Sequence, residues 1–189
     1  ALTWYVLTAM TAGVTIWCTH FIAILAYQLD APASFHLSLT FASLIIAILG
    51  STLGIVIAGL GRGFRATVVG GTIFGLAVAA MHYTGMVAYR VQGTIRWDMG
   101  YLVASVIIAM VLSVVALHFA RHGGARSVLK MTGMLTFVIL ALHFTVMAAF
   151  QVTPLADIPS YYNPDAYTPT PLTIAGPALT IVLAAFSTH

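Results

Sequence analysis

Six stretches of this chain contain no Asp, Glu, Lys or Arg, and each is longer than the roughly 20 residues that a helix needs to cross a bilayer core. They are residues 1–29, 31–61, 66–89, 99–120, 131–156 and 166–189. Of the 189 residues, 61% are hydrophobic and 6% are charged, which is too little charge for the surface of a soluble domain. The sequence therefore predicts an all-α fold, a polytopic membrane helix bundle with six transmembrane helices in a lipid bilayer.

The helices are expected near residues 3–27, 36–60, 66–90, 99–120, 127–150 and 172–188. The first is too long and too rich in Thr and Trp for a secretory signal peptide. The single cysteine, Cys18, excludes an internal disulfide. No nucleophile elbow, phosphate-binding loop, CxxC pair or paired-carboxylate site occurs, so nothing in the sequence indicates an enzyme.

Basic residues are concentrated in two of the expected loops, between helices 2 and 3 and between helices 4 and 5. These five of the seven basic residues are Arg62, Arg65, Arg121, Arg126 and Lys130. Cytoplasmic loops carry an excess of Lys and Arg, so we expect these loops, and both ends of this chain, on the cytoplasmic side of a bacterial inner membrane. Basic residues divided between short loops are no signal for nucleic-acid binding.

A histidine motif occurs three times in the chain. The copies are Cys18-Thr19-His20-Phe21, Met81-His82-Tyr83-Thr84-Gly85-Met86 and Leu142-His143-Phe144-Thr145-Val146-Met147, and their histidines are 62 and 61 residues apart. Residues 43–48 match 105–110 at the same offset, and 180–185 form a weaker copy. The sequence therefore predicts a single domain, 1–189, built from three helix-pair repeats at about 1–61, 62–125 and 126–189.

The three motif histidines are expected at one depth in the membrane. Each repeat contains two crossings, so the motif helices run in the same direction. Each histidine lies seven to eight residues before the polar end of its helix, or roughly 10–12 Å from that end. Ionisable groups inside a membrane are functional by default, so we expect a shared site towards the periplasmic side. The alternative is three buried histidines that each donate a hydrogen bond to a carbonyl or hydroxyl group.

Neighbouring side chains bear on what such a site binds. Met86 and Met147 lie four residues after His82 and His143, on the same helix face. A thioether favours Cu(I), and imidazole suits copper, zinc and iron. No carboxylate lies within an expected membrane core, which leaves hard cations without ligands. Met81 points about 100° away from His82 and ranks behind the other two methionines.

A second repeated position lies seven residues after each motif histidine. It is occupied by Tyr27, Tyr89 and Phe150. Aromatic side chains are enriched where membrane helices meet the aqueous phase, so we interpret these residues as an aromatic belt at the outer interface.

The segment Met81-His82-Tyr83-Thr84-Gly85-Met86 resembles the motif of the MHYT family, a bacterial integral-membrane sensor domain. The resemblance covers essentially the whole chain. It implies a copper site with His20, His82, His143, Met86 and Met147 as ligands, and a diatomic gas such as oxygen, CO or NO as the sensed ligand. It also implies seven transmembrane helices, one of them before Ala1, and a cytoplasmic signalling output such as cyclic-di-GMP synthesis or hydrolysis.

Thr19 and Leu142 depart from the motif, which usually has Met at these positions. Three functions remain open. The first is a membrane sensor module in which copper binds a gas or reports redox state. The second is an accessory or structural subunit of a larger membrane complex, without metal. The third is a b-type haem electron carrier, against which the equal depth of the three histidines argues.

Overall fold

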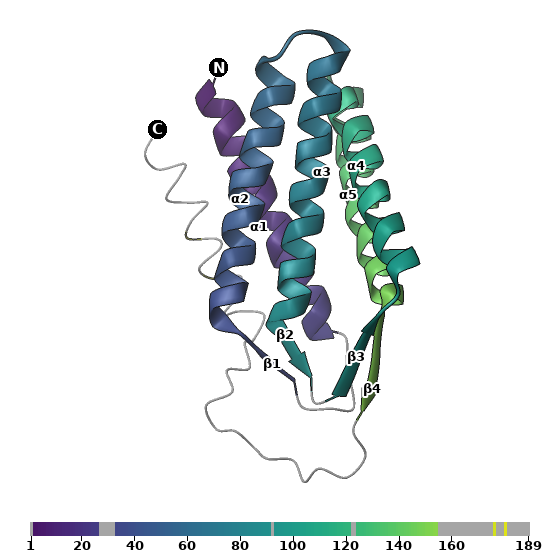
Figure 1. Cartoon of the computed structure of the whole chain (residues 1–189). Helices are drawn as coiled ribbons and strands as arrows, with labels where there is room; N and C mark the ends of the chain where they lie inside the picture. The colour runs from purple at the N-terminus through teal and green to yellow at the C-terminus, as the bar shows by residue number, and fades with distance from the viewer. Residues whose placement is uncertain are drawn as a thin grey trace.

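The computed structural model describes residues 2–26, 33–91, 93–121 and 124–154, together with Gly176 and Thr180. The helices are α1 (Leu2–Ala26), α2 (Leu37–Leu60), α3 (Gly63–Ala88), α4 (Met99–Ala120) and α5 (Ala125–Ala149). The strands are β1 (Ala33–Phe35), β2 (Tyr89–Val91), β3 (Gly93–Trp97) and β4 (Phe150–Pro154). The helices lie side by side, and the strands gather at the end of the bundle opposite the N-terminus (Figure 1).

Each of the five described helices is long and apolar enough to cross a membrane. This confirms an all-helical membrane bundle for the described part of the chain. The expected sixth helix, 172–188, lies outside the described residues apart from Gly176 and Thr180. The sixth helix and the third repeat therefore stay predictions.

The two complete helix pairs pack with the same close approach. A β-carbon at Gly13 in α1 would lie 2.6 Å from the carbonyl oxygen of Ala47 in α2. A β-carbon at Gly75 in α3 would lie 2.5 Å from the carbonyl oxygen of Ala109 in α4. Small residues let helix backbones approach closely in membranes. Gly75 and Ala109 lie 62 residues after Gly13 and Ala47. The sequence repeat is therefore also a repeat of helix packing.

A hydrogen bond between an aromatic side chain and a serine recurs in both pairs. Trp17 Nε1 donates to Ser43 Oγ at 2.9 Å, linking α1 to α2. The hydroxyl groups of Tyr83 and Ser105 lie 2.6 Å apart and link α3 to α4. The two serines begin the repeated segments 43–48 and 105–110, and these contacts account for the serine in an otherwise apolar stretch.

The short strands connect neighbouring repeats by antiparallel pairing. β1 pairs antiparallel with β2 and places Phe35 opposite Tyr89, while β3 pairs antiparallel with β4 and places Trp97 opposite Phe150. The ring centroids in these pairs lie 5.3 and 5.2 Å apart. Tyr89 and Phe150 are buried, so the interpretation of these two as an aromatic belt facing the membrane interface is wrong. Tyr27 lies outside the described residues.

Arg121 joins α4 to the turn between α2 and α3 at the other end of the bundle. Its guanidinium donates to the carbonyl oxygens of Ala58, Gly61 and Gly63 at 3.1, 3.3 and 3.0 Å, and to Thr67 Oγ1 at 3.1 Å. The last carbonyl groups of a helix have no partner within it, and a cation near that end is favoured by the helix dipole. Arg121 therefore caps the end of α2 from a helix in the next repeat.

Candidate metal centre

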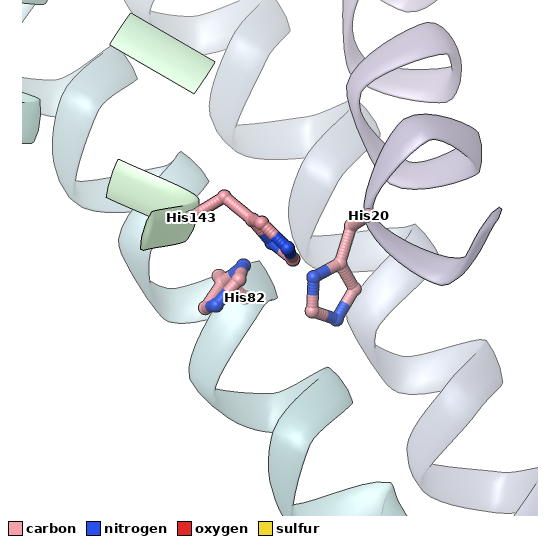
Figure 2. Close-up of side chains that lie close together, drawn as sticks. All are labelled: His20, His82 and His143. Carbon is pink, nitrogen blue, oxygen red and sulfur yellow. The ribbon is translucent and has the colours of Figure 1, made fainter. Parts of the chain in front are cut away.

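Three histidines from three different helices meet inside the bundle (Figure 2). They are His20 of α1, His82 of α3 and His143 of α5. Each lies six residues before the last residue of its helix: Ala26, Ala88 and Ala149. The three helices run in the same direction, so the rings share a depth of about 9 Å from the helix ends. The structure thus brings together the histidines that the sequence placed at equivalent positions.

One ring nitrogen from each histidine lies within 4.8 Å of the others. The ring centroids of His20 and His82 are 4.2 Å apart, and those of His82 and His143 are 5.6 Å apart. His20 and His82 are buried, whereas His143 is half-buried. His82 therefore adjoins both other rings, and His143 is the most accessible of the three.

Four nitrogens of these rings are buried and have no hydrogen-bond partner among the described residues. They are His20 Nδ1, His20 Nε2, His82 Nε2 and His143 Nδ1. A buried polar atom without a partner costs about 1–3 kcal/mol, so such atoms are rare unless something else binds them. The alternative of histidines held by carbonyl or hydroxyl groups is not supported at these four atoms. Each neutral imidazole has one nitrogen with a free lone pair, so each of the three rings can offer one to an electron-pair acceptor.

A cavity of about 60 Å³ adjoins the rings. One water molecule needs about 10–15 Å³ of such space, so the cavity has room for a small molecule. Besides the three histidines, it is lined by Ile16, Thr19, Ala23, Val78, Met81, Ile139, Leu140 and Leu142. The cavity is apolar apart from the imidazoles and one threonine.

The methionine that lines this cavity is Met81, and neither Met86 nor Met147 is among its lining residues. Side chains on a helix lean towards its N-terminus, so each histidine ring lies beside the helical turn that precedes it. Met86 and Met147 lie one turn further along, where they pack in and against the hydrophobic core. Their role as ligands stays a prediction from the sequence.

Other groups with ligand chemistry lie away from the cavity. His36 Nδ1 lies 2.9 Å from Ser38 Oγ at the exposed start of α2, and the ring of His118 contacts Phe64 near the other end of the bundle. Cys18 is partly buried and does not belong to the histidine group. Asp98, which is the one acidic residue in the described part of the chain, caps α4 by accepting from the backbone of Gly100 and Tyr101.

Residues 13–71 and 75–133 each match a family repeat whose description is "Bacterial signalling protein N terminal repeat", the MHYT repeat. Together the two matches cover more than half of the chain, and they are offset by the same 62 residues that separate His20 from His82. The chain belongs to the MHYT family. The resemblance of the histidine motif is thereby confirmed, and this MHYT chain carries a sensor domain of bacterial signalling proteins.

Curated relatives of this MHYT chain are signalling proteins that are several times longer than it. An uncharacterized signaling protein of Caulobacter vibrioides is 35% identical over 158 residues, which are 82% of this chain and 19% of the relative. The bifunctional diguanylate cyclase/cyclic di-GMP phosphodiesterase MucR of Pseudomonas aeruginosa is 35% identical over 80% of this chain and 23% of its own length. The cyclic di-GMP phosphodiesterase NbdA of the same organism is 34% identical over 82% of this chain and 21% of its own.

The MHYT chain thus spans about a fifth of the length of these relatives. Most of each relative, including the greater part of any enzyme its name describes, lies outside the match. No solved structure matches the chain.

Proposed function

We propose that this MHYT chain is the membrane sensor module of a cyclic-di-GMP signalling system, with a copper ion bound by His20, His82 and His143. The sensed quantity is a diatomic gas (oxygen, CO or NO) or the redox state of the copper. The observation that carries the proposal is the group of three imidazoles from three repeats, with nitrogens within 4.8 Å and without hydrogen-bond partners among the described residues.

The spacing of the nitrogens fits a single ion. A metal–imidazole bond is about 2.0–2.1 Å long, so two nitrogens on one ion lie at most about 4.2 Å apart. The largest separation here is 4.8 Å, which a small ring rotation removes. Three protein ligands leave a coordination position open, as in metal sites that bind an exchangeable small molecule. The cavity of about 60 Å³ suits a diatomic ligand at that position.

The surrounding donors favour copper over the alternatives. Three imidazoles also suit zinc, but the thioether of Met81 in the same cavity is a soft donor that favours Cu(I). Hard cations need oxygen ligands, and Asp98, the acidic residue of the described part, caps α4 instead. A volume of about 60 Å³ is far below the roughly 300–1,000 Å³ of pockets for larger organic ligands, which argues against a porphyrin.

The names of the relatives support a signalling output on cyclic di-GMP for the protein to which this sensor contributes. Binding at the histidines would bias the packing of α1, α3 and α5 and so reach the loops at the opposite end of the bundle. The competing function is a metal-free accessory subunit of a membrane complex.

Elemental analysis of the purified protein, together with its visible spectrum, tests the proposal. We expect about one copper per chain after growth with added copper and purification without chelators. Stoichiometric zinc would replace copper in the proposal, and a Soret band would indicate haem. Metal-free protein under these conditions would refute the metal site and favour the accessory-subunit function.

The orientation of the module in the inner membrane can be predicted from its loops. The turn between α2 and α3 and the start of α5 lie at the end of the bundle opposite the strands (Figure 1). The five basic residues near these two turns all belong to the described part of the chain: Arg62, Arg65, Arg121, Arg126 and Lys130. We expect this end in the cytoplasm and the histidines towards the periplasm.

Cysteine labelling checks this orientation in a Cys18→Ala background. Thr94→Cys, exposed on β3, should react with a membrane-impermeant maleimide in spheroplasts, and Ala125→Cys, exposed at the start of α5, should react only after the membrane is permeabilised. The reverse pattern would place the histidines near the cytoplasmic side.

A further inference from the structure

We infer that Gly85 is a positioning residue of the histidine cluster, because its missing side chain leaves the space in which the imidazole of His20 lies beside His82. This deepens the proposed function, since it names what admits one of the three ligands. The contact itself needs no metal, so it can be tested whether or not copper binds.

The contact is specific to one ring. Gly85 is buried, three residues after His82 on the same side of α3. A β-carbon at Gly85 would overlap Nε2 of His20 and lie 2.9 Å from its Cδ2. The third nearest atom, Cε1 at 3.4 Å, also belongs to His20. The three atoms nearest to such a β-carbon thus all belong to the His20 imidazole, which occupies the room for a side chain at Gly85.

Backbone conformation does not explain this glycine. The described glycines with a positive φ are Gly63 and Gly124, so Gly85 has a conformation that any residue adopts in a helix. Glycine inside a helix is disfavoured relative to alanine. Helix α3 thus has a helix-disfavouring glycine at the point where the His20 ring from α1 packs against it.

The equivalent position in the third copy of the motif carries a larger side chain and faces a wider ring pair. Val146 lies three residues after His143, as Gly85 does after His82, and it is fully buried. The pair that includes His143 has a centroid separation of 5.6 Å, compared with 4.2 Å for His20 and His82. We infer that the residue three positions after a motif histidine sets how closely the imidazole of the preceding repeat approaches that histidine. The site then consists of a close pair, His20 and His82, and a more distant third ring, His143.

The test is a double-mutant cycle on metal-free protein in detergent, read as the midpoint temperature Tm of helix loss. Gly85→Ala should lower Tm when His20 is present. In a His20→Ala background, the same substitution should leave Tm unchanged or raise it, because the methyl group then fills vacated space and alanine favours the helix. His20→Ser provides a second background of the same kind.

Two glycines of the chain serve as matched controls. Gly75→Ala overlaps the backbone of Ala109 and should lower Tm equally with and without His20. Gly133→Ala meets no atom within 4 Å among the described residues and should not lower Tm in either background.

An equal loss of Tm for Gly85→Ala in both backgrounds would overturn the inference, as would a double variant that fails to fold when His20→Ala folds. A single variant that fails to fold, together with a folded double variant, supports it. If the wild type binds Cu(II), electron paramagnetic resonance of Gly85→Ala should show fewer coupled nitrogens. An absence of copper in the wild type would count against the proposed function alone, since the Tm cycle is measured without metal.

Discussion

Replacing His82 with alanine is expected to remove copper from the purified protein, with the largest loss among the three histidines. His82 belongs to the one intact Met-His-Tyr-Thr motif, and its ring lies beside both of the others, with centroids 4.2 Å from His20 and 5.6 Å from His143, so its removal takes away the ligand that adjoins both neighbours. Changes to groups that merely support a metal ligand already weaken affinity by about 10–100-fold. We therefore expect at least about a 100-fold weaker affinity for His82→Ala, measured by competition with a copper chelator.

His36→Ala is the control for this prediction. His36 is exposed and pairs with Ser38 at the start of α2, away from the cavity, so its removal should leave the copper content unchanged. Full copper occupancy in His82→Ala would contradict the three-histidine site. Without a metal, His82→Ala would alter only stability, through the contacts of the ring with its neighbours.

The thioether donor is distinguished by two substitutions that conserve side-chain volume. The sequence favours Met86, which shares a helix face with His82, whereas the cavity lining favours Met81. We expect Met81→Leu to weaken retention of Cu(I) more than that of Cu(II), because a thioether is a soft ligand. The same selective loss in Met86→Leu, with Met81→Leu unaffected, would restore the assignment made from the sequence.

Gly75→Ala is expected to produce a large loss of stability, because the glycine lies against the backbone of a neighbouring helix. The added methyl group would lie 2.5 Å from the carbonyl oxygen of Ala109 and 2.8 Å from the Cα of Met110, and neither atom can move without shifting α4. Overpacking of this kind costs about 1–3 kcal/mol and sometimes more, offset in part by the better helix propensity of alanine. We expect the free energy of unfolding to fall by about 2 kcal/mol. Denaturant titration in detergent micelles measures this loss.

Gly133→Ala is the matched control, because the described structure leaves open space around Gly133. It should be neutral or stabilise the protein by up to about 1 kcal/mol. Gly75→Ala should also weaken copper binding, since His82 lies two turns further along the same face of α3. A Gly75→Ala protein as stable as the wild type would show that α3 and α4 are not held in close contact at this point.

Several features of this protein were determined by the sequence alone. Stretches without charge fixed the number and course of the described membrane helices, since only a helix satisfies its own backbone in lipid. The expected helices 36–60 and 99–120 lie within a residue of α2 (Leu37–Leu60) and α4 (Met99–Ala120). The repeated histidine motif identified the MHYT family and placed three rings at one depth, because a fixed offset along parallel helices is a fixed height.

The tertiary structure alone decided how these parts meet. The strands β1 to β4 are three to five residues long and pair across different repeats, so no local sequence pattern predicted them. Helical periodicity gives the direction of a side chain about its own axis, but it does not give the rotation of the neighbouring helix. For that reason the sequence ranked Met86 above Met81, and only the packed bundle showed that Gly85 makes room for the ring of His20.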